Sequence, residues 1–305
     1  KSIMGNNLSD KNENKEKKGR GVSHSKIILM GEHSVVYGYP AIAIPLKNIR
    51  MECIVEKATV PFVHNKKDTL STAIYTALNY LNRKNENIKY KVISDIPPKR
   101  GMGSSAAVSI AAIRGVLDYF NTEVDNLTLE KLVNEAEIIA HNTPSGLDAK
   151  TCLSDSAIKF IKNKGFKNLE MNLGAYLLIA DTGIHGHTRD AIMNIKNMGG
   201  RALPMLEKLG KLTEETEKFI EEKDVINIGK NMISAHGELK KLGVSIEKSD
   251  VLVKTAIDEG AYGAKMSGGG LGGCIIALME SKEKAEMTGK KLMEKGAVNI
   301  WIEAL

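Results

Sequence analysis

The stretch GMGSSAA, residues 101–107, follows two prolines and precedes a long apolar segment. Its side chains are almost unreactive, but glycine lets the backbone turn tightly and approach a ligand closely. The first N–H groups of the helix predicted after it lack intrahelical partners, and the helix dipole places partial positive charge there. Backbone donors and serine hydroxyls together favour an anion site, with nucleotide phosphates as the natural ligand. The residues leave one alternative open, a loop whose Ser104 or Ser105 caps a buried helix.

Several common nucleotide motifs are absent around this stretch. The GK[ST] ending of a Walker A loop is missing, and the glycine spacing does not match the dinucleotide-binding GxGxxG pattern. The chain also lacks the HRD and DFG signatures of protein kinases. A different phosphate-binding loop is therefore expected.

A second glycine-rich stretch, GAKMSGGGLGG (263–273), has glycine at six of its eleven positions. We expect it to form a loop between a helix and the strand predicted at 273–279. So many glycines cost backbone entropy on folding, which favours a loop that wraps a ligand over a plain connection. A flexible hinge without a ligand is the alternative.

Ionisable residues outside these loops could supply the chemistry. Lys26 opens an apolar strand that Glu32 and His33 follow, Glu137 lies near the end of a helix, and Asp148 stands three residues after a serine. Each has a plainer interpretation as a solvated charge or, for Asp148, part of a capping box. Together with the two loops, they match the needs of phosphoryl transfer, namely an anion site, a cation and a carboxylate beside the acceptor hydroxyl. The residues therefore predict a small-molecule kinase.

Composition places limits on location and partners. The 305 residues are 42% apolar and 26% charged, as in soluble globular proteins. Half of the net charge of +6 falls in the lysine-rich residues 1–20, which predict a disordered tail, so the basic charge indicates no nucleic-acid partner. No apolar run approaches ~20 residues, and no signal peptide is recognised, so we expect a cytoplasmic protein without membrane association. Three widely spaced cysteines indicate buried, reduced thiols.

Hydrophobic periodicity predicts an α+β fold of two lobes. We expect a tail over 1–20, an N-terminal ATP-binding lobe over 21–172 and a C-terminal lobe over 173–305. Regular structure is predicted to begin near Ser25. The predicted strands are 26–31, 41–46, 51–58, 88–97, 174–183, 273–279 and 298–305. The predicted helices are 69–82, 106–120, 129–142, 187–198, 201–222, 224–241, 247–259 and 281–295.

Three segments together resemble a known family. PPKRGMGSSAA (97–107) resembles the ATP-binding motif of the GHMP kinases, SKIILMGEHSVVYGYPAIAIPL (25–46) their N-terminal motif, and KMSGGGLGGCIIAL (265–278) their C-terminal glycine motif. The resemblance covers about residues 21–305 in family order. It implies an N-terminal lobe like ribosomal protein S5 domain 2 and a ferredoxin-like C-terminal lobe. GEHSVVYG and NTPSGLDAK are most similar to the mevalonate kinases within the family.

The resemblance also implies an activity and its residues. The activity is phosphorylation, dependent on ATP and Mg²⁺, of the C5 hydroxyl of mevalonate to 5-phosphomevalonate, in the mevalonate route to isoprenoids. Asp148 matches the catalytic aspartate and Lys26 the lysine that neutralises charge around the phosphoryl group. The magnesium ligands of the family match Ser105 and Glu137, with Ser104 as a further candidate. Positions near mevalonate match Glu32, His33 and Thr188. The ATP-binding loop corresponds to Pro97, Lys99, Arg100, Gly101, Met102, Gly103, Ser104, Ser105, Ala106 and Ala107, and the C-terminal glycine loop to Ser267, Gly268, Gly269 and Gly270.

Some departures and alternatives stay open at the sequence level. Ser34 and Met102 stand where the family often has alanine and leucine, and Leu271 interrupts the glycine run. Phosphomevalonate kinase or another GHMP kinase is the main alternative, since Arg100 and Arg189 could bind a phosphorylated acceptor. A catalytically silent nucleotide-binding regulatory protein is the non-enzyme alternative, although the retained ionisable residues argue against it. The oligomeric state is open, with a homodimer as one expectation.

Overall fold

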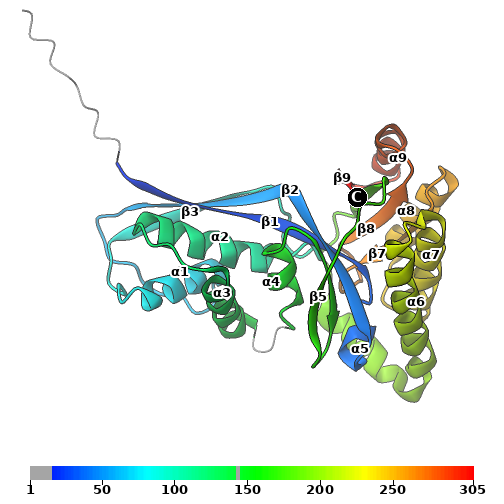
Figure 1. The fold of residues 1–305 in the computed structure, drawn as a ribbon, viewed down its shortest axis with the longest axis horizontal. Helices are drawn as coiled ribbons and strands as arrows, with labels where there is room; N and C mark the ends of the chain where they lie inside the picture. The colour runs from blue at the N-terminus through cyan, green and yellow to red at the C-terminus, as the bar shows by residue number, and fades with distance from the viewer. Residues whose placement is uncertain (1–15, 142–144) are drawn as a thin grey trace, which may run out of the picture.

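A computed structural model describes residues 16–141 and 145–305. Within these ranges, the strands form two antiparallel sheets, each with helices against it, and the molecule is elongated along the axis that joins them (Figure 1). Most of the predicted tail, residues 1–20, therefore lies outside the described residues, as do Asn142, Thr143 and Pro144 of the NTPSGLDAK motif. The predicted α+β, two-lobed fold is confirmed.

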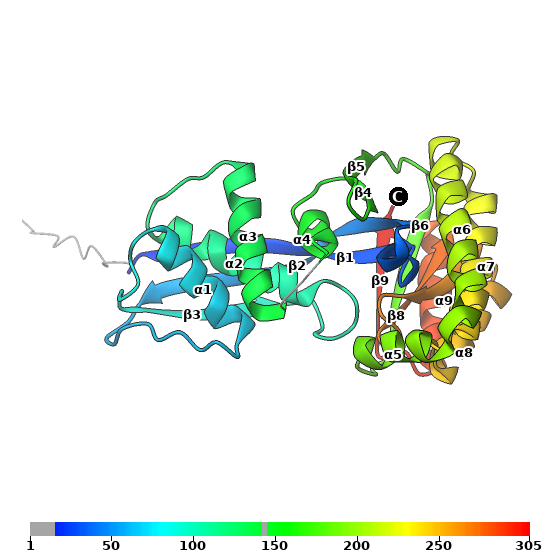
Figure 2. The same cartoon turned by 90° about the horizontal axis from the view of Figure 1, so that it is seen from below.

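The first sheet follows the order β1-β2-β4-β5, with β3 also paired to β2. Helix α2 is its central helix: it packs on β1 and β2 and is largely buried, as its apolar sequence predicts. Helices α1 and α3 pack against α2 and each other on the same side of the sheet (Figure 2). The strands are β1 (Lys18–Met30), β2 (Pro40–Lys57), β3 (Ile88–Ser94), β4 (Ala157–Ile161) and β5 (Gly165–Leu169), and the helices are η1 (Ser34–Tyr37), α1 (Thr69–Tyr80), α2 (Ser104–Tyr119), α3 (Asn126–His141) and α4 (Leu147–Cys152).

The second sheet follows the order β7-β8-β6-β9. Its chain order, strand, helices, two strands, helix and strand, with the first and last strands adjacent, is the ferredoxin-like arrangement that was expected. Helices α7 and α8 pack on β7, and α9 packs on β6 and β9. The strands are β6 (Tyr176–Asp181), β7 (Gly263–Ser267), β8 (Cys274–Met279) and β9 (Asn299–Ala304), and the helices are α5 (Thr188–Met198), η2 (Gly199–Ala202), α6 (Leu203–Glu221), α7 (Val225–Lys241), α8 (Glu247–Asp258) and α9 (Lys282–Glu294).

Strand β1 begins earlier than the sequence predicted. It starts at Lys18, not near Ser25, and so includes the last three residues of the predicted tail. Gly19 and Gly21 face α2, and a Cβ on Gly21 would lie 2.0 Å from the carbonyl oxygen of Ala111. Periodicity missed this segment because its inward positions are glycines, which carry no hydrophobic signal.

Other differences concern β2, β7 and three short elements. The strands predicted at 41–46 and 51–58 are one continuous strand, β2, which pairs with β1 along most of its length. The stretch 263–273, predicted as a loop, begins with strand β7, so only residues 268–273 are loop. Helix α4 and strands β4 and β5 were not predicted, since each is six residues or shorter and carries little periodic signal.

A shared hydrophobic core joins the two halves. One cluster of buried side chains includes Ile27 of β1, Leu209 of α6 and Ile276 of β8. Cys53, Cys152 and Cys274 are buried free thiols, as predicted, and burial raises the pKa of each. No helix within residues 16–141 and 145–305 is both long and apolar enough to cross a membrane.

Candidate active site

Strand β1 holds the ATP-binding loop in place. The carbonyl oxygen of Met102 accepts hydrogen bonds from the Ser25 hydroxyl at 2.6 Å and from the Lys26 N–H at 3.2 Å. Met102 itself is buried, so it fills the core where the family often has leucine. The loop is therefore attached to the strand that carries the expected catalytic lysine.

The start of helix α2 differs from a serine-capped helix. Its N-cap is Gly103 in the left-handed conformation, with φ 74°, and the helix begins at Ser104. A Cβ on Gly103 would lie 2.9 Å from Cγ of Lys26 and 3.0 Å from Sγ of Cys152, so a larger residue does not fit. The alternative that Ser104 or Ser105 caps this helix is wrong. Both serines lie in the first turn, where backbone N–H groups lack intrahelical partners and favour an anion.

Lys26 and Asp148 form an ion pair. The Lys26 Nζ lies 2.9 Å from Oδ1 of Asp148; the lysine side chain is 3% exposed and the aspartate 51%. Asp148 lies in the first turn of α4, whose N-cap is Gly146, and Ser145 accepts a hydrogen bond from the Leu147 N–H. The capping-box alternative for Asp148 is therefore not realised, because its carboxylate reaches across to β1.

Next to this pair lies a cavity of about 280 Å³. The Ser105 hydroxyl donates a hydrogen bond to Oε1 of Glu137 at 3.3 Å, and Ser109 donates to the same oxygen at 2.9 Å. The structure thus brings together two residues that lie far apart in the sequence and were predicted to share a metal ion. The cavity is lined by Ser105, Asn134, Glu137, Ser145, Gly146, Asp148 and Ala149.

Two residues of this site were missed at the sequence level. Asn134 precedes Glu137 by about one helical turn of α3, and Ser109 follows Ser105 by one turn of α2. Helical spacing was the available signal, since residues three or four apart share a face. In the described part of the chain, no group of three or more His, Cys, Asp and Glu side chains is arranged to hold a metal ion.

The residues expected near the acceptor gather on the glycine loop. Nε2 of His33 donates to the carbonyl oxygen of Gly269 at 2.7 Å, and burial lowers the pKa of this histidine. Thr188, the exposed first residue of α5, also lies against Gly269, since a Cβ there would be 2.1 Å from its Oγ1. Glu32 is buried, and its Oε1 lies 2.5 Å from Nζ of Lys265. His33 and Thr188 therefore meet at one loop residue, whereas Glu32 faces inward.

The two glycine-rich loops are in contact. A Cβ on Gly101 would lie 3.2 Å from Cα of Gly268, so the backbones approach closely. The Ser267 hydroxyl donates to the carbonyl oxygen of Ile28 in β1. Leu271, which interrupts the glycine run, adopts φ 55° and donates its N–H to the carbonyl oxygen of Val244 at 2.8 Å. The interruption therefore leaves the loop closed against its neighbours.

Arg100 and the prolines lie at the other end of the ATP-binding loop. Nε of Arg100 donates to Oδ1 of Asp181 at 2.7 Å, and both side chains are buried or nearly so. The carbonyl oxygen of Lys99 accepts from the Gly186 N–H. Beside them lies a cavity of about 610 Å³ lined by Asn48, Ile49, Ser94, Asp95, Ile96, Pro97, Pro98, Asp181, Asn299 and Trp301.

Comparisons with known proteins show the family of this chain. The model of the GHMP kinases N terminal domain matches residues 71–155, and that of the GHMP kinases C terminal domain matches residues 216–296. The mevalonate kinase of Pyrococcus furiosus is 32% identical over 306 residues, covering 88% of this chain and 91% of the relative.

Solved structures show the same fold. Mevalonate kinase from L. major in complex with R-mevalonate superposes with a TM-score of 0.84 at 24% identity, covering 94% of this chain and 95% of that one. Mevalonate kinase from methicillin-resistant Staphylococcus aureus superposes with a TM-score of 0.77 at 29% identity. The match covers 95% of this chain and 99% of that one. From the domain matches and the full-length relatives, the chain belongs to the GHMP kinase family, within its mevalonate kinase group.

Proposed function

We propose that this chain transfers the γ-phosphoryl group of ATP to the C5 hydroxyl of mevalonate. The observation that carries the proposal is the Lys26–Asp148 pair at 2.9 Å, beside the first turn of α2 and the cavity that holds Ser105 and Glu137. This arrangement supplies the parts that phosphoryl transfer requires from a protein. Full-length relatives named mevalonate kinase support the choice of acceptor.

The chemistry follows from the pair. Lys26 is buried beside Asp148, and its side chain can neutralise charge that develops on the transferred group. Asp148 is half-exposed, which lets its second oxygen reach an acceptor hydroxyl and orient it or accept its proton. Holding the hydroxyl between these side chains, in line with the phosphoryl group, lowers the entropic part of the activation barrier.

Ser105 and Glu137 fit a magnesium ion. Two oxygen donors suit Mg²⁺, which keeps several waters and takes further ligands from nucleotide phosphates, so a larger cluster of acids is not needed. Their oxygens lie 3.3 Å apart at the cavity wall. Ser105 and Glu137 would hold the ion, and the ion would neutralise phosphate charge when bound.

The 610 Å³ cavity is our candidate for the nucleoside of ATP. It begins at Pro97 and Pro98, directly before the phosphate loop, and offers polar side chains together with the flat ring of Trp301. Trp301 is the only tryptophan in the sequence. ATP binding should therefore change the intrinsic tryptophan fluorescence, and an unchanged spectrum at saturating ATP would contradict this placement.

One contact bears on phosphomevalonate as the acceptor. Arg100, one of the two arginines that could bind an acceptor phosphate, is paired with Asp181. Arg189 is exposed at the start of α5 and keeps the alternative open. The deciding experiment is a coupled assay of ADP release with ATP and mevalonate, phosphomevalonate, homoserine or galactose. Turnover with mevalonate alone is expected, and turnover confined to another acceptor, or to none, would overturn the proposal.

A further inference from the structure

Lys265 is a fully buried charge that the proposed phosphoryl transfer does not use. It lies in β7 with 0% of its side chain exposed. Its Nζ lies 2.5 Å from Oε1 of Glu32 and donates to the carbonyl oxygen of Met266 at 2.7 Å. Removing an ammonium group from water is costly unless close partners compensate. A lysine kept in such a place calls for an explanation beyond filling space.

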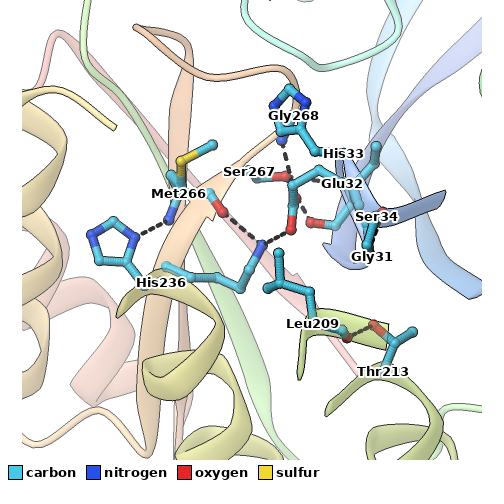
Figure 3. Close-up of polar contacts among 12 residues, drawn as sticks. Gly31, Glu32, His33, Ser34, Leu209, Thr213, His236, Met266, Ser267 and Gly268 are labelled. Atoms are coloured by element: carbon cyan, nitrogen blue, oxygen red, sulfur yellow. Dashed lines mark hydrogen bonds and ion pairs between the residues drawn. The ribbon is translucent and has the colours of Figure 1, made fainter. Parts of the chain in front are cut away.

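The carboxylate of its partner Glu32 binds both strand β7 and the glycine loop that follows it. While Oε1 is bound by Lys265, Oε2 accepts a hydrogen bond from the Gly268 N–H at 3.3 Å. Figure 3 shows the Glu32 carboxylate between these groups, with Gly268 above it. Both carboxylate oxygens therefore bind the protein itself, and Glu32 acts on a ligand through the glycine loop.

The loop that Glu32 holds carries the acceptor side of the site. Gly268 is followed by Gly269, whose carbonyl oxygen accepts from His33 and whose Cα lies against Thr188. Gly268 also packs on Gly101 of the ATP-binding loop. A shift of the loop at Gly268 would thus move the groups expected around the acceptor.

The strand on which Lys265 lies is fixed independently. The Met266 N–H donates to Nδ1 of His236 at 3.0 Å (Figure 3). The Ser267 hydroxyl donates to the carbonyl oxygen of Ile28 in β1 at 2.7 Å. These contacts and the ladder with β8 hold β7 without the lysine charge. The ammonium group is therefore not needed to hold the strand. Its main effect is on Glu32 and, through Glu32, on the loop that begins at Gly268.

We propose that Lys265 is a positioning residue for the acceptor: its buried ammonium holds Glu32 so that Glu32, His33 and the loop 268–270 form the acceptor side of the site. The inference rests on the proposed function, since the acceptor is the substrate named there. Lys265 itself acts through Glu32 and touches neither substrate nor nucleotide.

The test compares Lys265→Met, Glu32→Gln and the double variant with wild type, by steady-state kinetics and thermal unfolding. Lys265→Met should raise KM for mevalonate at least about ten-fold, with KM for ATP within about three-fold. The double variant removes both charges, so its midpoint of thermal unfolding should recover toward wild type, because no unpaired buried charge remains. The KM of the double variant for mevalonate should stay raised, since the Lys265–Glu32 pair no longer positions the loop 268–270.

The controls separate the possible failures. Lys284→Met removes an exposed lysine that pairs with Glu280, and should change neither KM nor thermal stability. If KM for mevalonate recovers with stability in the double variant, the role of Lys265 is purely structural and the inference is overturned. A wild-type KM for mevalonate in Lys265→Met would overturn it as well. Should Lys265→Met fail to fold, the double variant gives the decision. Wild type without mevalonate turnover contradicts the proposed function instead.

Discussion

At the scale of single residues, the site depends on charges placed by contacts far apart in the chain. Lys26 is 3% exposed and meets Asp148 from α4, while Glu137 of α3 meets Ser105 of α2. The buried groups, Lys26 and Glu137, are bound by these partners and are shielded from water. Single substitutions that preserve shape should therefore separate chemistry from folding.

Asp148→Asn should lower kcat about 100-fold or more and change KM for mevalonate little, because the amide keeps the shape but cannot accept a proton. The measurement is steady-state kinetics with saturating ATP. Glu283→Gln, which alters an acid in the first turn of α9, is the control and should leave kcat unchanged. Activity of Asp148→Asn within about ten-fold of wild type, a barrier change of only ~1.4 kcal/mol, would remove Asp148 from the catalytic step.

Glu137→Gln should raise the Mg²⁺ concentration needed for half-maximal activity, since a carboxylate binds Mg²⁺ more strongly than a neutral amide. The amide oxygen can still accept from Ser109, so the helix packing should survive. Activity is measured against Mg²⁺ concentration at fixed ATP. Glu135→Gln, an exposed acid on the same helix, is the control. An unchanged metal dependence of Glu137→Gln would exclude Glu137 from the metal site.

His236→Gln should weaken the pH dependence of stability. Nδ1 of His236 accepts from the Met266 N–H and Nε2 donates to Asp250, so the ring is held neutral. Burial lowers its pKa, with Lys265 and Lys240 lowering it further and Asp250 opposing them.

A lowered folded-state pKa means that the unfolded chain binds the proton more readily. The His236 contribution is then complete above about pH 6.5 and is lost as the pH falls toward the folded-state pKa. Urea unfolding of wild type and His236→Gln between pH 5 and 7.5 should show a smaller loss of stability for the variant. His185→Gln, at an exposed site, is the control. Parallel pH curves for wild type and His236→Gln would contradict the assignment.

At the scale of elements, close packing of β1 on α2 depends on glycines in the strand. Gly19 and Gly21 let the helix backbone approach, since Cβ atoms there would overlap Gly115 and Ala111. That packing places the first turn of α2, our candidate phosphate site, against the strand that bears Lys26. The position of the site therefore depends on residues without side chains.

Gly21→Ala should destabilise the protein by about 1–3 kcal/mol, because the added methyl would lie 2.0 Å from a helix carbonyl oxygen and force α2 away. Urea denaturation gives the free energy of unfolding. Gly200→Ala is the matched control, because a Cβ there meets nothing within 4 Å. Equal stabilities of the two variants would show that β1 and α2 do not pack this closely.

At the scale of the whole molecule, the residues of the candidate active site lie where the two sheets meet. Strand β1 contacts β7, and the ATP-binding loop contacts the last residue of β6 through the Arg100–Asp181 pair. Neither sheet carries all the predicted residues. Contacts between the halves should therefore affect both stability and ATP binding.

Arg100→Met should lower the free energy of unfolding by about 3 kcal/mol, because it leaves Asp181 buried without its cation. It should also raise KM for ATP, since Arg100 belongs to the loop. Arg83→Met breaks an exposed pair with Glu86 and should cost less than about 1 kcal/mol. Urea unfolding and ATP titration are the measurements. If Arg100→Met lowers the free energy of unfolding no more than Arg83→Met does, the Arg100–Asp181 pair does not link the two halves.

Much of this arrangement was predictable from local pattern. Long apolar helices such as α2 and the strand around Lys26 carry periodic signals that survive without tertiary information. The start of β1 and the strand β7 were missed, since glycine faces inward in one and a buried lysine interrupts the other. Local pattern reports side-chain polarity, and at these positions backbone approach and charge pairing decided the structure.

Motif spacing and residue chemistry are local properties, so they were enough to predict the family, the two glycine-rich loops and Lys26, Glu137 and Asp148 as candidate site residues. Which charges meet depends on the tertiary structure. It paired Lys26 with Asp148, Arg100 with Asp181 and Lys265 with Glu32 across 80 or more intervening residues. Such pairs form where packing of the two sheets excludes water, and that exclusion is a property of the folded whole.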